Sequence, residues 1–191
     1  MKNVNQPETL RSKLIIAGIN EINQHGIVDF SLRRVATSCG ASCAAPYKHF
    51  ENKNDLILEI IKYINHKWNL LEEQIVKIFN EDKLTLIIEL SLANIRFKLA
   101  NPDFRSILMT NEKSLEESQI TEVNKMSDTL SLLVTEYFKN KGNTPDEIKI
   151  KLFLIKSIIY GAVIQTESSE ISNIEEAMKT VKNTLIEILT N

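Results

Sequence analysis

FSLRRVATSCGASCAAPYKHFENKNDL, residues 30–56, decides the fold, because it predicts two short helices around a tight turn and the start of a third. The first helix, residues 31–38, has one apolar face at helical spacing, formed by Leu32, Val35 and Ala36. Gly40 tolerates the positive φ that follows a helix end, and Ser42 can cap the next helix. A helix stop and a helix start three residues apart are typical of a helix-turn-helix.

The second predicted helix begins at Ser42 with small side chains and continues with Tyr47 and Lys48. Small side chains let a helix end approach base edges, and tyrosine and lysine can reach phosphates on either side. The basic residues also gather here, since residues 1–55 carry seven Lys and Arg against five Asp and Glu, although the whole chain has a net charge of −2. This pattern predicts a surface for double-stranded DNA.

Residues Thr9 to Ile61 resemble the DNA-binding segment of the tetracycline-repressor (TetR) family of bacterial transcription regulators. The resemblance rests on GASCAAPYKHFENKNDL, on SLRRVA before it, and on a first helix that ends in His25-Gly26. A later run, NIRFKLANPDFRSILM at residues 94–109, resembles a segment in the regulatory halves of one subgroup. The resemblance implies that residues near the bases are Arg33, Ser42, Cys43, Ala44 and Pro46, and that the phosphates are held by Arg11, Tyr47, Lys48 and Lys53.

Pro46 does not fit a regular second helix, because it lacks the N–H that would make the first intrahelical bond. We expect a distorted first turn. Tolerated strain and contact between the ring and a thymine methyl are equally good interpretations of this proline.

Cys39 and Cys43 flank the turn and are too few for a disulfide framework, so free thiols are the simplest expectation. A redox switch that deforms the turn is an alternative hypothesis. A zinc site formed by the two cysteines and His49 is the least favoured hypothesis, because no fourth ligand occurs at the spacing typical of zinc sites.

The composition predicts a nearly all-helical chain, since only five Gly and four Pro interrupt 191 residues that are 43% apolar. We predict an N-terminal three-helix DNA-binding domain at residues 1–55 and a helical effector-binding and dimerisation bundle at residues 56–191. About nine helices are expected in all. A long helix should join the two parts, because isoleucines and Trp68 recur every three or four residues as far as Phe79.

Several classes of protein are disfavoured. The sequence has no signal-peptide pattern and no apolar run of about 20 residues, so a cytoplasmic protein without a membrane partner is expected. No nucleophile, base and orienting acid can be assembled around its three histidines, and no glycine-rich phosphate loop occurs, so neither an enzyme nor a bound cofactor is predicted.

Large adaptable side chains in the C-terminal part suggest a pocket for a small, largely apolar effector, although ordinary core is the commoner role of each. The predicted contacts are Trp68, Phe97, Phe104, Met109, Met126, Phe138 and Tyr160. Among charged residues, Glu89 and Arg96 share a helix face and could serve the same pocket, or simply be solvated.

The helix from Pro145 to about Thr166 is apolar nearly all round, so it must be covered on more than one side. Together with the last helix it could form a four-helix interface in a homodimer. The predicted interface residues are Phe153, Ile158, Gly161, Ala162, Met178, Val181, Leu185 and Ile188.

These observations favour a homodimeric regulator, a repressor by preference, which binds a palindromic operator and responds to an effector. Control by a protein partner or by cysteine oxidation, without a small effector, remains the alternative, and activation is also compatible with the sequence.

Overall fold

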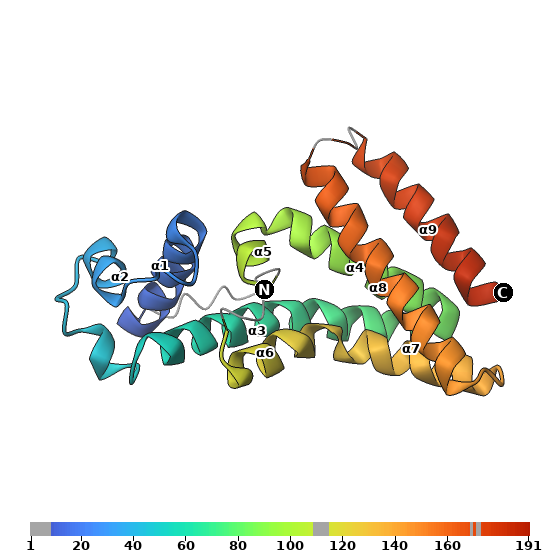
Figure 1. Cartoon of the computed structure of the whole chain (residues 1–191), viewed down its shortest axis with the longest axis horizontal. Coiled ribbons are helices and arrows are strands. Elements are labelled where there is room, and N and C mark those ends of the chain that lie inside the picture. Colours follow the sequence, from blue (N-terminus) through green and yellow to red (C-terminus); the bar gives the residue numbers. More distant parts are fainter. Residues whose placement is uncertain (1–8, 109–114, 169, 171–172) are drawn as a thin grey trace. The chain divides into compact units, whose positions relative to one another are not determined.

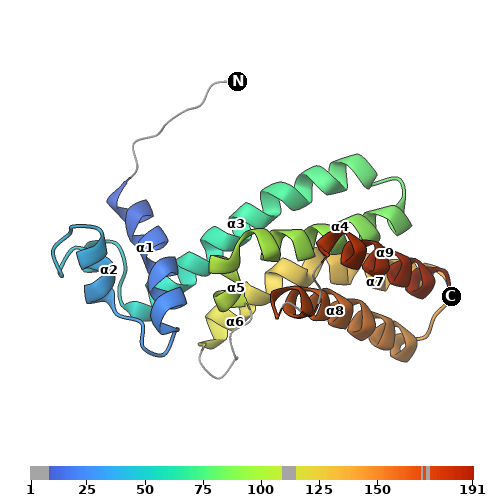
Figure 2. The same cartoon turned by 90° about the horizontal axis from the view of Figure 1, so that it is seen from above.

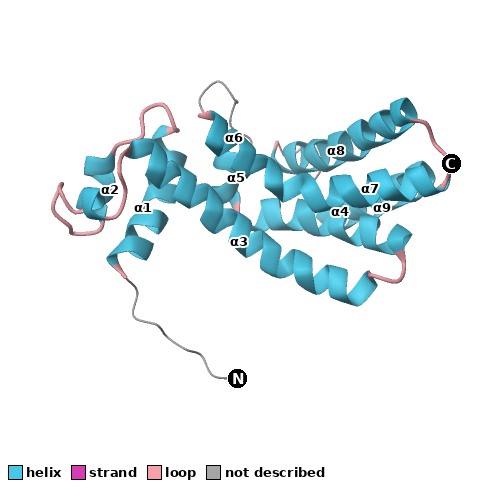
Figure 3. Cartoon of the chain, turned by 90° about the horizontal axis from the view of Figure 1, so that it is seen from below, coloured by secondary structure: helices cyan, strands magenta, loops and turns pink. Residues whose placement is uncertain are grey.

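The computed structural model describes residues 9–108, 115–168, 170 and 173–191. Within these ranges every regular element is helical, and no strand occurs, which confirms the predicted all-α class (Figures 1 and 3). The elements are α1 (Leu10–His25), α2 (Leu32–Ser38), η1 (Pro46–Lys48), α3 (Lys53–Phe79), α4 (Lys83–Ala100), α5 (Pro102–Leu108), α6 (Glu117–Asn124), η3 (Lys125–Ser127), α7 (Asp128–Asn140), α8 (Pro145–Glu167) and α9 (Ile174–Thr190). No helix in the described ranges is long and apolar enough to span a bilayer.

Contacts divide the chain into two compact units. Unit 1 comprises Met1–Lys67 with Pro102–Asn124, and unit 2 comprises Trp68–Asn101 with Lys125–Asn191. The long helix α3 contributes to both units and is one continuous helix (Figure 2). The predicted boundary after residue 55 separates DNA binding from effector binding, and as a functional boundary it stays a prediction. Packing groups the chain differently, because α5 packs against α1.

Helix starts follow local side-chain chemistry. The N-cap side chains accept bonds from the free N–H groups of the first turn, as seen at Thr9, Ser31, Asp82, Thr144 and Asn173. Before α8, Glu147 also reaches back to the N–H of Thr144, which completes a capping box. These caps explain why the helices begin where the sequence predicted, since each depends on residues only three apart.

The core of unit 1 depends on a close approach of α1 and α3. A Cβ at Gly18 would lie 2.5 Å from Cδ1 of Ile60 and 3.6 Å from the ring of Phe30. Buried isoleucines at 57, 60, 61 and 64 fill the α3 side of this contact. The apolar stripe of α3 is not buried to its end, however, because Ile78 is 69% exposed.

One stretch with helical apolar spacing is not a single continuous helix. Between Val123 and Phe138 the chain passes through α6, η3 and α7. The amide of Asn65 donates to the carbonyl oxygen of Glu122 at 2.6 Å, an oxygen that a continuous helix would offer to Met126. A side chain that enters the ladder of backbone bonds commonly interrupts a helix in this way.

Unit 2 is a packed group of helices in which α4 contacts α7, α8 and α9. The middle of α4 is buried on nearly every side, from Leu86 to Ile95 except for the half-buried Glu89. By contrast, α8 keeps several apolar residues exposed, which are Ile150, Phe153, Leu154, Tyr160 and Ile164. The prediction that α8 needs cover beyond its own chain therefore agrees with its exposed surface.

Candidate nucleic-acid interface and ligand site

The turn after α2 has the geometry that its glycine predicts. Gly40 has a φ of +66°, and its N–H donates to the carbonyl of Thr37. The N–H of Ala41 donates to the carbonyl of Ala36 at 2.9 Å. This pair of bonds is a Schellman motif, which satisfies carbonyls at the end of α2 and turns the chain sharply.

The second helix of the helix-turn-helix is shorter than predicted. Only Pro46–Lys48 form a helix, and it is a 3₁₀ helix, η1. The carbonyl of Ser42 would accept from residue 46 in an α-helix, but Pro46 has no N–H, and Ala45 donates to that carbonyl instead at 2.9 Å. Ser42 therefore accepts through its backbone, and no side chain caps η1.

Most of the predicted DNA-contacting residues are exposed around this turn. The exposed ones are Arg33, Ser42, Cys43, Ala44, Tyr47 and Lys48, and Tyr47 is 62% exposed although it is aromatic. Pro46 is the exception, because it is buried, and its predicted place near a base stays a prediction. Of the two interpretations of Pro46, the structure supports the tolerated distortion of the backbone. Cys39 and Cys43 are both free thiols.

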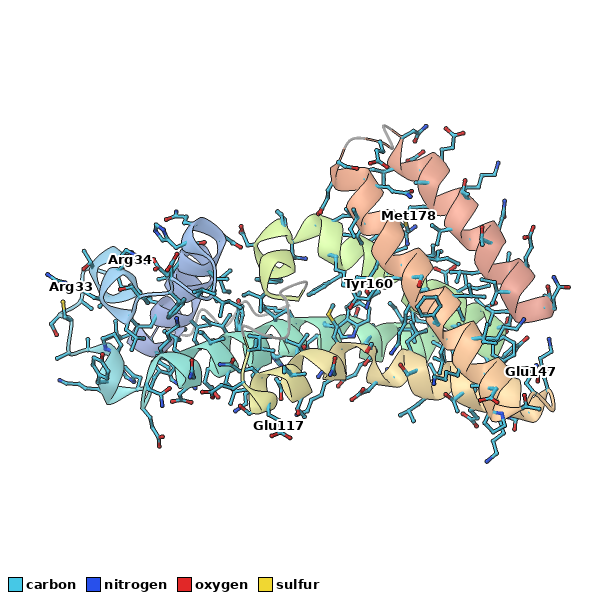
Figure 4. The ribbon with its side chains drawn as sticks, viewed as in Figure 1. Arg33, Arg34, Glu117, Glu147, Tyr160 and Met178 are labelled. Carbon is cyan, nitrogen blue, oxygen red and sulfur yellow. The ribbon has the colours of Figure 1, made fainter. Side chains whose placement is uncertain are left out.

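Two neighbouring arginines of α2 have different surroundings (Figure 4). Arg34 donates to the carboxylate of Glu21 and to the carbonyl of Asp29. The same carboxylate, only 6% exposed, also accepts from the N–H of Ser31 at 3.0 Å. Arg34 therefore fastens α2 to α1, and its bond to Glu21 raises the pKa of the Arg34 guanidinium above its ordinary value. Arg33 is exposed, and its side chain makes no hydrogen bond or ion pair within the described residues, which leaves it available for DNA.

Arg11 and Lys53, the predicted phosphate ligands outside the turn, already have partners. Arg11 pairs with Glu59 and lies over the ring of Phe50, 5.4 Å from its centroid. Burial acts to raise the pKa of Glu59, but bonds from Lys62 and Arg11 hold it below its ordinary value. Lys53 donates to the carbonyl of Val28 at 2.8 Å. Either cation would have to share or exchange its partner to hold a phosphate.

The side chain of Asn52 caps the start of α3. Oδ1 of Asn52 accepts from the N–H groups of Asn54 and Asp55 at 2.8 and 3.0 Å. The carboxylate of Asp55 reaches past the cap and accepts from the N–H of Glu51 at 2.9 Å. These bonds fix the segment between η1 and α3.

Sequence reasoning missed a polar seam between α3 and α6 in unit 1. Gln119 is buried, and its amide donates to the carbonyl of Asn54 at 2.9 Å. Farther along, Asn65 donates to both the carbonyl and the carboxylate of Glu122. The seam joins α6 to the helix that begins beside the candidate interface, and only contacts across more than fifty residues reveal it.

The predicted effector contacts are divided between the two units. Trp68, Phe97, Met126 and Phe138 are buried in unit 2. Phe104 is half-buried in unit 1 and packs against Tyr63 with 6.4 Å between ring centroids, while Tyr160 is partly exposed. Met109 lies outside the described residues.

Trp68 has the most defined surroundings of this set. Its ring meets Phe97 at 5.5 Å, and its Nε1 donates to Glu72 at 3.2 Å. Glu72 also accepts from Thr129 at 2.9 Å, and burial raises the pKa of this carboxyl above its ordinary value. Of the two charged residues predicted to serve the pocket, Glu89 pairs with Lys182 at 3.4 Å and Arg96 is exposed.

The predicted dimer residues fall into two groups. Ala162, Met178, Val181 and Leu185 are buried within the protomer, because the apolar stripe of α9 packs on α4 and α8 of the same chain (Figure 4). Burial within the protomer is therefore the observed role of these four, and their part in a dimer interface stays a prediction. Phe153 is 69% exposed, and Ile158, Gly161 and Ile188 are half-buried.

A groove of about 630 Å³ runs between α8 and α9. Its walls mix small and polar residues with apolar ones, including Ser157, Ile158, Gly161, Ala177 and Thr180. A Cβ at Gly161 would meet nothing within 4 Å, so the groove is open at that point.

The comparisons with known proteins agree with this geometry. Residues 14–60 match the family model described as bacterial regulatory proteins, tetR family. No curated protein matches the chain. Solved structures are similar over nearly the whole chain, at sequence identities that establish the fold alone.

One similar structure is FadR from Bacillus subtilis in complex with stearoyl-CoA, with 14% identity, a TM-score of 0.67 and coverage of 93% of this chain and 96% of that one. A TetR variant from Acinetobacter baumannii AYE in complex with minocycline has 17% identity and a TM-score of 0.56, with 93% and 92% covered. A TetR/AcrR-family regulator from Thermobifida fusca YX-ER1 has 17% identity and a TM-score of 0.61, with 92% and 95% covered.

Proposed function

Because the chain has the N-terminal domain and the fold of a tetR-family transcriptional regulator, we propose that it is a ligand-responsive repressor that binds a palindromic operator as a homodimer. The observation that carries this proposal is the exposed surface around the turn. Ser42, Cys43, Ala44, Tyr47 and Lys48 are all exposed within the matched segment, while the intervening Ala45 and Pro46 are buried. Regulators of this family are generally not enzymes, and we infer that this chain acts by binding alone.

In the proposed complex the two sides of the turn have different tasks. Arg33, Ser42, Cys43 and Ala44 meet base edges, where short side chains permit close approach. Tyr47, Lys48 and Lys53 hold phosphates, which position the protein but carry no sequence information. Arg11 joins them when it exchanges the carboxylate of Glu59 for a phosphate.

The second copy is proposed to pack against α8 and its groove with α9. Phe153 and the neighbouring exposed residues of α8 would otherwise remain in water, and burying apolar surface drives such association. A two-fold axis would place the two copies of the surface around the turn in successive major grooves, roughly 34 Å apart.

The effector is proposed to bind within unit 2, near Trp68 and Phe97. Similar structures hold stearoyl-CoA and minocycline, which are large, partly apolar molecules. Such a ligand can shift the equilibrium between the DNA-binding conformation and the non-binding one only by the difference in its binding free energy for the two, typically about 1–3 kcal/mol. Unit 1 offers a route for this shift, because α6 is hydrogen-bonded to α3 through Gln119.

Selection of bound fragments from random DNA, followed by titration of variants, tests the proposal. We expect a palindromic site, loss of base preference in Arg33→Ala, and uniformly weaker binding in Tyr47→Ala and Lys53→Ala, with a salt slope lower by about one for Lys53→Ala, which removes a cation, and unchanged for Tyr47→Ala. Lys13→Ala is the matched control, because Lys13 is exposed on α1 away from the turn. No enriched sequence, a monomer by light scattering, or identical specificity profiles for all variants would contradict it.

A further inference from the structure

Helix α4 carries a stripe of buried polar residues inside an otherwise apolar unit. Ser91, Asn94 and Lys98 are 0%, 5% and 4% exposed, and their spacing of three and four places them on one face of the helix. Ser91 is satisfied, since its hydroxyl donates to the carbonyl of Ile87 at 2.7 Å. The other two are not.

Lys98 is a buried cation without an anion. No carboxylate in the described residues pairs with it, and its Nζ instead lies 4.3 Å from the ring centroid of Tyr160 on α8. Burial alone lowers the pKa of Lys98 to about 8, so most molecules still carry the charge at neutral pH. Buried charges in proteins are nearly always paired, because an uncompensated one is costly.

Asn94 is incomplete one helical turn away. Its Oδ1 is buried and accepts no hydrogen bond in the described structure. Rotation of the amide exchanges its oxygen and nitrogen, so the same side chain can present an N–H donor at this point. A cation without an anion and an amide with an unsatisfied oxygen, four residues apart on one face of α4, can together hold a carboxylate once the amide is rotated.

Tyr160 is the cover of this pair. It projects from α8, which packs on α4, and 40% of the residue is exposed (Figure 4). Burial raises the pKa of its phenol, so the ring stays neutral over the Lys98 ammonium.

We propose that Lys98 and Asn94 form the anion-binding end of a ligand site in unit 2, and that the ligand is an organic carboxylate with an apolar body. One ammonium matches one negative charge, which favours a carboxylate over a phosphate dianion. The remaining buried residues of α4 and α8 that could surround the ligand are mainly apolar, among them Leu90, Ile95, Ile155, Ile159 and Val163. This inference deepens the proposed function, and it rests on that function in placing the effector within unit 2.

Calorimetric titration of the purified full chain tests the site without DNA. The probes are straight-chain carboxylates of two to twelve carbons, with 1-octanol and octyl phosphate as headgroup controls. We expect affinity to rise with chain length, octanoate to bind more tightly than octanol or octyl phosphate, and Lys98→Met to weaken octanoate at least tenfold while leaving octanol unchanged. Lys179→Met removes an exposed lysine of α9 and should behave as wild type.

The opposite outcomes overturn the inference. They are no binding of any carboxylate to the wild type, equal binding to Lys98→Met, or acetate binding as tightly as octanoate. Lys98→Arg keeps the cation and serves as the second variant, and it should retain binding that Lys98→Met loses.

DNA binding is measured separately, so the two proposals can fail separately. Carboxylate binding that leaves operator affinity unchanged would contradict ligand control but keep the site. Operator binding by a protein that binds no carboxylate would overturn only the site.

Discussion

The two units of this protein each bury a charged side chain, and they treat it in opposite ways. In unit 1 the carboxylate of Glu21, 6% exposed, accepts bonds from Arg34 and from the N–H of Ser31. In unit 2 the ammonium of Lys98, 4% exposed, lies against the face of an aromatic ring and pairs with no carboxylate in the part of the chain that the structure describes. The first arrangement fastens two helices together, whereas the second has no evident structural purpose.

The contrast is between a buried charge that contributes to the stability of the fold and one that lowers it. A satisfied buried charge holds one geometry, and removing its partners costs stability. An unsatisfied one destabilises the protein, and sites of this kind are commonly retained for function at a cost in stability. The comparison therefore predicts that removing the buried charge raises the free energy of unfolding in unit 2 and lowers it in unit 1.

The largest expected effect is stabilisation by Lys98→Met. A pKa lowered from 10.5 to about 8 in a residue this buried corresponds to at most about 3 kcal/mol of destabilisation at neutral pH, at about 1.4 kcal/mol per unit. The variant should raise the free energy of unfolding in urea by up to that amount, while Lys179→Met should stay within about 0.5 kcal/mol of wild type. A destabilised Lys98→Met would mean that Lys98 supports the fold.

Glu21→Leu should act in the opposite direction. The substitution removes the acceptor of the Ser31 N–H and leaves the guanidinium of Arg34 with the carbonyl of Asp29 at the junction of α1 and α2. We expect a loss of about 2 kcal/mol in the free energy of unfolding, in the range for an unsatisfied buried group. Urea denaturation followed by circular dichroism measures it, and a neutral result would remove the distinction between the two buried charges.

The pH dependence of stability is the third test. The folded-state pKa of Lys98 lies below its unfolded value, so the unfolded chain binds more protons between about pH 8 and 10.5. Wild-type stability should therefore rise relative to Lys98→Met across this window, by at most about 1.4 kcal/mol per pH unit. Parallel stability curves for the two proteins would show that Lys98 is not desolvated in solution.

The smallest expected effect concerns the pair of Arg11 and Glu59. Exposed ion pairs are worth about 0.2–1 kcal/mol, so Glu59→Gln should free Arg11 and raise DNA affinity about twofold to fivefold at low salt. Fluorescence anisotropy with labelled DNA would detect the change. Glu73→Gln, an exposed substitution on the same helix, is the control, and an equal gain there would reduce the effect to net charge.

Features set by neighbouring residues could be predicted from the sequence. The caps at Ser31, Asn52 and Thr144, the positive φ at Gly40 and the distortion at Pro46 all depend on side chains within a few positions. The all-helical class followed from periodicity and composition in the same way. The exposure of most of the candidate DNA surface followed as well, because it depends on which residues the helix face leaves outside.

Features set by distant residues could not be predicted. The break before α7 depends on Asn65, which lies 57 positions from its bonding partner Glu122. The apolar stripe of α9 was recognised correctly, but periodicity does not say which helix covers it, and Leu185 proved to be core. Lys98 was overlooked because a lysine in a helix is usually solvated, and only the surrounding helices reveal its burial.

The shortness of η1 has a consequence for the genes that such a regulator could control. In the proposed complex η1 supplies phosphate contacts through Tyr47 and Lys48, and four residues, Arg33, Ser42, Cys43 and Ala44, meet the bases, so each half of a palindromic operator would specify a short and degenerate sequence. Selectivity in a genome would then come largely from the paired arrangement of the two halves. Point changes in a promoter would be tolerated more readily than insertions between the half-sites, and new targets could arise from few mutations.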